Sequence, residues 1–150
     1  MARRFDNLVV GGGMSGLPFA LRAARHGSTA FVERELLGGT CLNRGCIPTK
    51  TMTASAKVAQ QVRRAAEFGV HTSAPRVDLG EVLDRRDGIV DGIRSGLSKA
   101  VGRSGDLELF DGHGRFVGPR CLEVDGTTIE AGRVIVPRSS GPIHRAARIA

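Results

Sequence analysis

The chain has 150 residues, which is enough for one domain with a hydrophobic core but too few for two full domains. No apolar run approaches the roughly 20 residues that a membrane-spanning helix needs. The first residues lead into a short strand rather than into the apolar region of a signal peptide. We therefore expect a cytoplasmic protein that has no membrane partner.

The formal net charge is +7, which raises the question of a nucleic-acid partner. Residues 137–150 contain three arginines and no acidic residue, so they supply +3 and leave +4 for the rest of the chain. The basic residues form no stripe interleaved with aromatic side chains on which bases could stack. The sequence therefore favours a protein that binds no nucleic acid, and a basic nucleic-acid binder is the minor alternative.

The chain begins with the pattern of a dinucleotide-binding unit. A short apolar strand at residues 8–10 is followed by a G-x-G-x-x-G turn that contains Gly11, Gly13 and Gly16. Helical spacing of apolar residues follows over 17–26, and residues 30–33 predict a second strand that ends in Glu33. In such a unit the glycines let the backbone approach a pyrophosphate, and the acid accepts hydrogen bonds from a ribose. The spacing alone does not choose between FAD and NAD.

The segment 38–50 carries two of the three cysteines, Cys41 and Cys46, in a polar and turn-prone run. Positions five apart in a regular helix are separated by about 7.5 Å along the axis, whereas a disulfide requires Cα atoms roughly 4.4–6.8 Å apart. The pair can therefore close only where the chain is irregular, which Gly45 allows. We interpret Cys41 and Cys46 as a redox dithiol.

The surroundings of this pair support that interpretation. Arg44 and Lys50 bring positive charge, which lowers the pKa of a thiol. Pro48 suits the first turn of a following helix, whose positive end would favour a thiolate at Cys46. A zinc site or a static disulfide is the alternative, although the nearest histidines, at positions 26 and 71, lack the spacing of zinc ligands.

The remaining sequence predicts two helices and a small antiparallel sheet. Residues 51–68 and 78–101 have helical spacing, and Asp78 is the expected N-cap of the second helix. Strands are expected at 107–110, 115–117, 121–124, 127–129 and 133–136, with a tight turn at Asp125-Gly126. We expect Cys121, which has no partner in the sequence, to be inert packing. The fold class predicted is α/β, a Rossmann-type unit with a helical excursion and an antiparallel meander.

The run Gly-Gly-Thr-Cys-Leu-Asn-Arg-Gly-Cys-Ile-Pro-Thr-Lys at 38–50 strongly resembles the redox-active segment of the class I pyridine nucleotide-disulfide oxidoreductases. This family includes dihydrolipoamide dehydrogenase, glutathione reductase and mercuric reductase. The Thr-Met-x-Ala-Ser-Ala run that follows is most similar to the mercuric reductase-like branch. The resemblance covers about residues 5–136.

The resemblance implies the cofactors and the roles of the site residues. It implies that the first nucleotide unit binds FAD and that NAD(P)H reduces it in the complete enzyme. Cys46 is then the thiol facing the flavin, and Cys41 the thiol that exchanges with a small-molecule disulfide or Hg(II). The implied cofactor contacts are at Gly11, Gly13, Ser15, Gly16, Glu33, Gly39, Thr40, Lys50 and Gly114. A simple helix-start hydrogen bond for Ser15 and a plain turn glycine for Gly114 are the alternatives.

The family pattern breaks after Val136, where Ala-Thr-Gly would be expected and Pro137-Arg138-Ser139 stands instead. We therefore expect residues 1–136 to be the N-terminal part of an FAD-binding domain and 137–150 to be a truncated or frame-shifted end. Such a fragment would be inactive alone. The complete enzyme is expected to be a homodimer. The alternative is a non-enzymatic remnant that binds FAD weakly or not at all.

Overall fold

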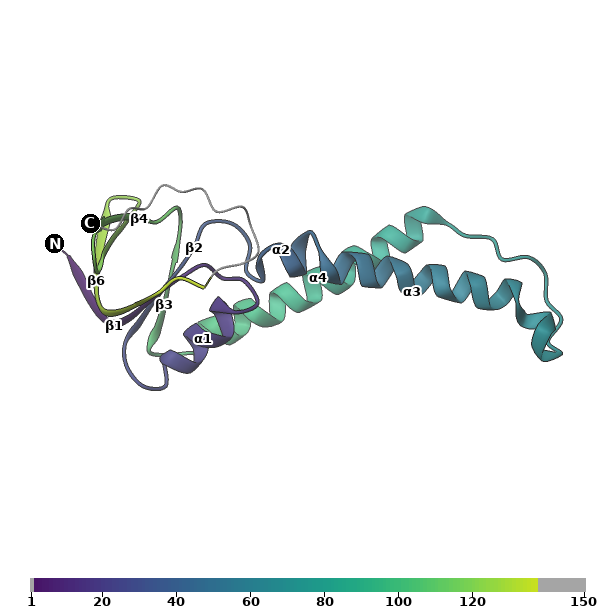
Figure 1. Ribbon diagram of the computed structural model, residues 1–150, viewed down its shortest axis with the longest axis horizontal. Coiled ribbons are helices and arrows are strands. Elements are labelled where there is room, and N and C mark those ends of the chain that lie inside the picture. Colours follow the sequence, from purple (N-terminus) through teal and green to yellow (C-terminus); the bar gives the residue numbers. More distant parts are fainter. Residues whose placement is uncertain (1, 138–150) are drawn as a thin grey trace.

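The computed structural model describes residues 2–137 and is built on a six-stranded sheet in the order β3-β2-β1-β6-β5-β4 (Figure 1). The strands are β1 (Arg3–Val10), β2 (Thr29–Glu33), β3 (Leu107–Asp111), β4 (Arg115–Gly118), β5 (Cys121–Val124) and β6 (Thr127–Ile135). The helices are α1 (Gly16–Ala23), α2 (Gly39–Asn43), α3 (Cys46–Arg63), the 3-10 helix η1 (Ala65–Phe68) and α4 (Leu79–Gly102). This arrangement confirms the predicted α/β fold class.

The sheet combines a parallel part with an antiparallel one. Strands β3, β2, β1 and β6 pair in parallel, whereas β6, β5 and β4 pair antiparallel. The parallel part with its β1-α1-β2 connection is the predicted Rossmann-type unit, and the antiparallel part is the predicted meander. The hairpin between β5 and β6 turns at Asp125 and Gly126, both of which have positive φ, as the Asp-Gly pair predicts.

The two strands predicted at 127–129 and 133–136 are in fact one strand, β6. Residues 127–130 pair with β5 and residues 129–135 lie in the pairing with β1, so Ile129 pairs with both Leu122 and Arg3. Gly132 lies inside it, and a Cβ there would come within 3.1 Å of the Asp6 carbonyl oxygen. The glycine therefore marks a close approach to β1 rather than the end of a strand.

Both faces of the parallel sheet are covered, because successive side chains of a strand point to opposite faces. On one face, Val9 and Phe31 pack with Leu17 and Ala20 of α1 and with Val101 at the end of α4. On the other face, Leu8 belongs to a second cluster, which comprises Ala30, Val32, Leu122, Val124, Ile129 and Ala131. The continuous apolar runs of β1 and β2 are what such a doubly covered sheet requires.

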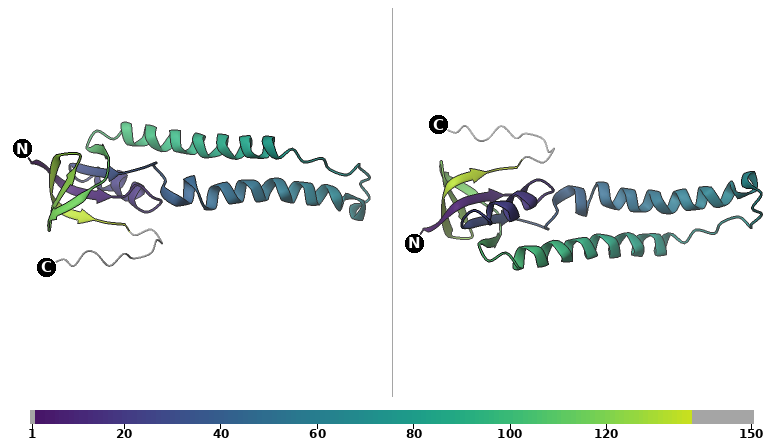
Figure 2. Two further views of the ribbon diagram at one scale, coloured as in Figure 1. Left: turned by 90° about the horizontal axis from the view of Figure 1, so that it is seen from above. Right: turned by 90° about the horizontal axis from the view of Figure 1, so that it is seen from below.

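Helices α3 and α4 form a long antiparallel hairpin that projects away from the sheet (Figure 2). Helix α3 begins at Cys46, so that Pro48 lies in its first turn as expected and the helix includes residues before the predicted 51–68. Beyond Arg63 it gives way to η1. Asp78 caps α4 as predicted, because its side chain accepts a hydrogen bond from the Glu81 backbone N–H at 3.2 Å. None of the helices within residues 2–137 combines the length and the apolar character needed to cross a membrane.

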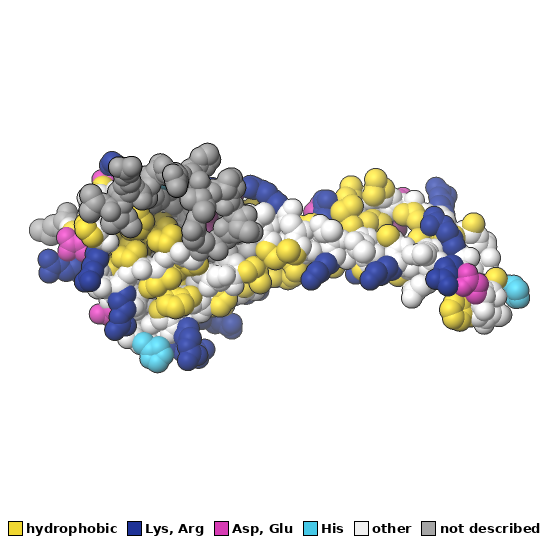
Figure 3. Space-filling view, viewed as in Figure 1, with side chains coloured by type: hydrophobic (Ala, Val, Ile, Leu, Met, Phe, Trp, Pro, Cys, Tyr) yellow, Lys and Arg dark blue, Asp and Glu magenta, His cyan; other side chains and the backbone are white. Residues whose placement is uncertain are grey.

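The hairpin leaves apolar side chains exposed, which Figure 3 shows as yellow patches along its length and at its tip. These side chains include Val58, Phe68, Val70, Val77, Leu79 and Ile93. Only Thr51 and Ala59 of α3 are buried. The hairpin is therefore held to the sheet mainly at its base, where α2 and the end of α4 lie.

Candidate functional site

The glycine turn between β1 and α1 is shaped by close backbone contacts. Gly11 has a φ of 110°, which strongly favours glycine, and its N–H donates to the Val32 carbonyl at 2.7 Å. A Cβ on Gly16 would lie 1.9 Å from the Gly11 carbonyl oxygen, so the first residue of α1 needs glycine to pack there. In contrast, a Cβ on Gly13 would meet nothing within 4 Å. The turn thus needs glycine at position 11 for its backbone angle and at position 16 for close packing, and it is open at Gly13.

Glu33 ties this turn to the end of β2. One carboxylate oxygen, Oε2, accepts a hydrogen bond from the Gly12 N–H, and the other, Oε1, accepts from Arg34 N–H at 2.8 Å and from Glu35 N–H at 2.9 Å. A carboxylate has about four acceptor positions. The side chain can therefore hold the turn in place and still accept one further hydrogen bond from a ligand.

The cysteine-bearing segment lies directly against the glycine turn. Gly38 forms a bridge with Gly13, and its N–H donates to the Gly12 carbonyl at 2.8 Å. Gly38 and Gly39 both have positive φ, and a Cβ on Gly39 would lie 2.9 Å from the Gly13 Cα. Two motifs that are separate in the sequence are therefore joined backbone to backbone.

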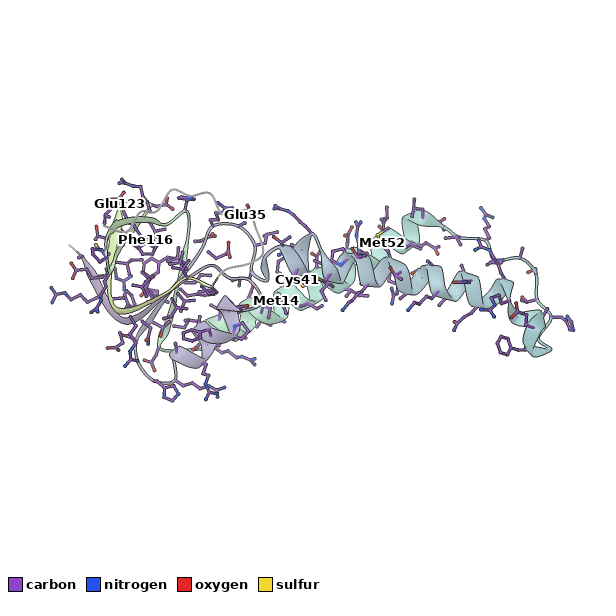
Figure 4. The ribbon with its side chains drawn as sticks, viewed as in Figure 1. Met14, Glu35, Cys41, Met52, Phe116 and Glu123 are labelled. Carbon is purple, nitrogen blue, oxygen red and sulfur yellow. The ribbon has the colours of Figure 1, made fainter. Side chains whose placement is uncertain are left out.

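Cys41 lies in α2 and Cys46 is the first residue of α3, so the helical path is broken between them, as the disulfide geometry predicts. A Cβ on Gly45 would lie 3.1 Å from the Thr40 carbonyl oxygen and 3.5 Å from the Cys41 Cα, which shows how sharply the chain folds back. Figure 4 places Cys41 at the junction of the sheet and the helical hairpin. All three cysteines are free thiols in this structure.

The two thiols interact with each other. A hydrogen bond with the Cys46 side chain, together with burial, raises the pKa of Cys41 above the ordinary value for a thiol. A hydrogen bond with the Cys46 backbone and, less strongly, the charge of Lys50 lower the pKa of Cys41, but these effects are smaller. Arg44 pairs instead with Glu35, with 2.8 Å between Nη2 and Oε2. At Cys41, therefore, the thiol-thiol contact outweighs the nearby positive charge, contrary to the expectation of a lowered pKa.

The sequence and the fold of this chain are similar to those of known proteins. A sequence model described as pyridine nucleotide-disulphide oxidoreductase matches residues 5–143. The chain belongs to this family. The dihydrolipoyl dehydrogenase of Bacillus subtilis is 40% identical over 134 residues, which cover 89% of this chain and 28% of that protein. That of Chlamydia muridarum is 38% identical over 146 residues, which cover 95% of this chain and 31% of that protein.

The chain thus spans about three tenths of the length of these family members. Among solved structures, the HOCl-induced flavoprotein disulfide reductase RclA from Escherichia coli superposes with a TM-score of 0.73 at 22% identity, over 91% of this chain and 29% of that one. A likeness at this level of identity shows the shared fold. The resemblance to the family predicted from residues 38–50 is confirmed, and the family match extends past Val136 to residue 143.

The remaining predicted residues lie at several places around this family's motifs. Ser15 is exposed at the start of α1 and makes no side-chain capping hydrogen bond, so the simple helix-start role is absent. Thr40 and Lys50 are exposed in α2 and α3. Gly114 lies between β3 and β4, where a Cβ would come within 2.6 Å of the Leu122 Cδ2 atom. A packing reason for this glycine therefore exists beside any contact with a cofactor.

Sequence analysis missed two features of the site. Asn43 links α2 to the preceding loop and to Arg94 of α4, although both are ordinary polar residues in the sequence. The positive φ angles of Gly38 and Gly39 set the entry into α2. The adjacent glycines gave a hint of this turn, but no pattern linked Asn43 with a residue in α4.

Proposed function

We propose that this chain supplies the FAD-binding and dithiol-bearing part of a disulfide oxidoreductase in which Cys41 and Cys46 are the redox pair. The observation that carries this proposal is the backbone junction between Gly38 and Gly13, because it sets the dithiol segment against the nucleotide turn. Membership of the family supports the same assignment. A reducing compartment such as the cytoplasm would keep such a pair available for turnover.

The residues of the glycine turn fit a bound FAD. The open side of Gly13 leaves room for a pyrophosphate, and the free hydroxyl of Ser15 stands at the start of α1, where an anion is favoured. Glu33 retains an acceptor position for the ribose. We assign further contacts to Gly11, Gly16, Gly39, Thr40, Lys50 and Gly114. When bound, FAD would supply the relay of an electron pair from NAD(P)H to a disulfide.

The cysteines would carry out the exchange with the acceptor. The thiolate of Cys41 attacks one sulfur of the acceptor disulfide, forms a mixed disulfide and releases one thiol. Cys46 then attacks the Cys41 sulfur, releases the second thiol and forms the Cys41–Cys46 disulfide. The acceptor gains two electrons and two protons, which the dithiol loses. Cys46 is exposed and Cys41 partly buried here, and we assign the flavin side to Cys46.

The acceptor we favour is a small disulfide of the lipoamide type, because the relatives described above are dihydrolipoyl dehydrogenases. Hg(II) is a second candidate, which rests on the run Thr51-Met52-Thr53-Ala54-Ser55-Ala56 and its likeness to the mercuric reductase-like branch. We further propose that the complete enzyme is a homodimer.

The dithiol assignment is tested by mapping the cysteines. After mild oxidation we expect a Cys41–Cys46 disulfide and a free Cys121, because the chain folds back before Cys46, where a Cβ on Gly45 would lie 3.5 Å from the Cys41 Cα. Alkylation followed by peptide mass mapping measures this directly. A bridge from Cys41 to Cys121, or three equally labelled thiols in the oxidised protein, would show that the assignment is wrong.

The cofactor assignment is tested at Gly13. A valine side chain would fill the open side of the turn, so we expect Gly13→Val to reduce FAD binding by at least tenfold while the fold is kept, since no protein atom opposes the new Cβ. Quenching of FAD fluorescence on titration with protein reports binding, and circular dichroism reports folding. Equal FAD affinity of the variant and the parent chain would contradict the proposed pyrophosphate position.

A further inference from the structure

Helix α2 has only five residues, Gly39–Asn43. An isolated helix of this length is unstable in water, because forming the first turn fixes several residues for a single hydrogen bond. Contacts from outside must therefore hold α2, and with it Cys41, in position. Leu42 is buried and supplies one of these contacts, and Asn43 supplies the others.

Asn43 connects three segments through its side chain. Its Nδ2 donates to the Gly39 carbonyl at 2.9 Å and to the Leu37 carbonyl at 3.1 Å. Its Oδ1 accepts a hydrogen bond from Arg94 Nη1 at 3.1 Å. The amide therefore fastens the loop before α2, the first residue of α2 and a guanidinium of α4 to one another.

Arg94 is well placed to act as a fixed point. Its Nη2 pairs with Asp91 one turn earlier on α4, which orients the guanidinium. Leu97 and Val101, later on the same helix, pack against the buried cluster of the sheet. The Arg94 side chain is 30% exposed, so the hydrogen bond to Asn43 is partly shielded from water.

We propose that Asn43 and Arg94 are positioning residues that fix α2 and thereby hold the Cys41 thiol against Cys46. This inference rests on the proposed redox role of the two cysteines. Neither Asn43 nor Arg94 exchanges electrons or protons in it. Both act by restricting the dithiol to geometries close to that of the disulfide.

The proposal predicts the direction in which the reduction potential of the Cys41–Cys46 pair changes. In the disulfide form the S–S bond itself restrains α2, whereas in the dithiol form the restraint comes from the Asn43–Arg94 contact. Loosening that contact gives more conformational freedom to the dithiol than to the disulfide. The equilibrium therefore moves toward the dithiol, and the reduction potential of the pair rises.

A purely electrostatic role of Arg94 would predict the opposite change in the reduction potential. If Arg94 acted only through its positive charge, its loss would destabilise the thiolate and so disfavour the dithiol. The reduction potential would then fall. Asn43→Ala changes no charge, so this variant and Arg94→Met together separate positioning from electrostatics.

The experiment measures the Cys41–Cys46 equilibrium in the 150-residue chain. The protein is equilibrated with defined ratios of reduced and oxidised dithiothreitol, quenched with acid and alkylated, and each cysteine is quantified by peptide mass mapping. The variants are Asn43→Ala, Arg94→Met and the milder Arg94→Lys, which remains informative if Arg94→Met does not fold. The matched control is Arg86→Met, because Arg86 pairs with Asp87 of the same helix.

We expect Arg94→Met to lower the equilibrium constant for disulfide formation by about three- to tenfold, the range that the loss of one hydrogen bond produces. Asn43→Ala should lower it by at least as much, because it removes the same hydrogen bond and those that Nδ2 donates. A tenfold change corresponds to a rise of about 30 mV in the potential. The equilibrium constant of Arg94→Lys should lie between those of these variants and that of the parent chain, and the constant of Arg86→Met should equal that of the parent. Unchanged constants in both variants, or an increased constant, would overturn the proposal. Failure of the parent chain to form the disulfide would instead refute the redox role itself.

Discussion

The close packing of Gly16 against Gly11 leads to a test of the glycine turn in the substitution Gly16→Ala. The added Cβ would lie 1.9 Å from the Gly11 carbonyl oxygen and 3.1 Å from the Gly11 carbonyl carbon. Both atoms belong to the backbone at the end of β1, so no side-chain rotation can relieve the overlap. Helix α1 must move away from the sheet, and Leu17 and Ala20 must leave their contacts with Val9 and Phe31.

The magnitude follows from two opposing effects. Overpacking of a well-packed interior costs about 1–3 kcal/mol, and a backbone obstacle places this site toward the upper end. Replacing glycine by alanine in a helix recovers up to about 1 kcal/mol, and less at the first helical position, which Gly16 occupies. We therefore expect the free energy of unfolding to fall by about 2 kcal/mol. With a urea m-value of about 2 kcal/mol/M, the midpoint falls by about 1 M.

Urea titration followed by circular dichroism measures the effect, and Gly13→Ala is the matched control. A Cβ on Gly13 meets no atom within 4 Å, although the residue belongs to the same turn. Gly13→Ala should therefore keep the parent midpoint within about 0.3 M. Equal midpoints for Gly16→Ala and Gly13→Ala would refute the conclusion that the two glycines serve different purposes.

Two further predictions concern the thiols and the activity. The hydrogen bond with Cys46 raises the pKa of Cys41, so alkylation of Cys41 by iodoacetamide should reach half its maximal rate at a higher pH than alkylation of an ordinary thiol. Cys46→Ala should lower the pH of this midpoint. An unchanged midpoint would contradict the thiol-thiol contact. The folded chain binds this proton more tightly than the unfolded chain, so the associated stability is present below the unfolded pKa and is lost as pH rises through the raised folded value. We also predict that the 150-residue chain alone, with excess FAD, oxidises neither NADH nor NADPH when lipoamide, glutathione disulfide or Hg(II) is the acceptor. The chain contains one dinucleotide fingerprint, and positioning of the nicotinamide needs another. Absorbance at 340 nm follows this reaction, and turnover that requires Cys46 would show that the prediction is wrong.

Residues 138–150 lie outside the described part of the chain. The interpretation of residues 137–150 as a truncated or frame-shifted end remains a prediction. Reading the nucleotide sequence past codon 136 in the other two frames tests it, since a lost frame would encode Ala-Thr-Gly and a second glycine fingerprint.

Local chemistry let the sequence determine much of the fold. The G-x-G-x-x-G turn, the Asp78 cap and the Asp125-Gly126 hairpin all follow from the conformational preferences of a few neighbouring residues, and all are confirmed. The break between Cys41 and Cys46 likewise follows from the reach of a disulfide compared with the rise of a helix. These features need no information about distant residues.

Contacts between distant residues were decided only by the tertiary structure. The continuity of β6 depends on its pairing with β5 on one side and with β1 on the other, and no pattern within the strand reveals these partners. The bridge from Gly38 to Gly13 and the hydrogen bond from Arg94 to Asn43 join segments that pack only once the sheet and the hairpin have formed. The pKa of Cys41 was missed for the same reason, since it depends on how close the two thiols come rather than on the charges nearby in the sequence.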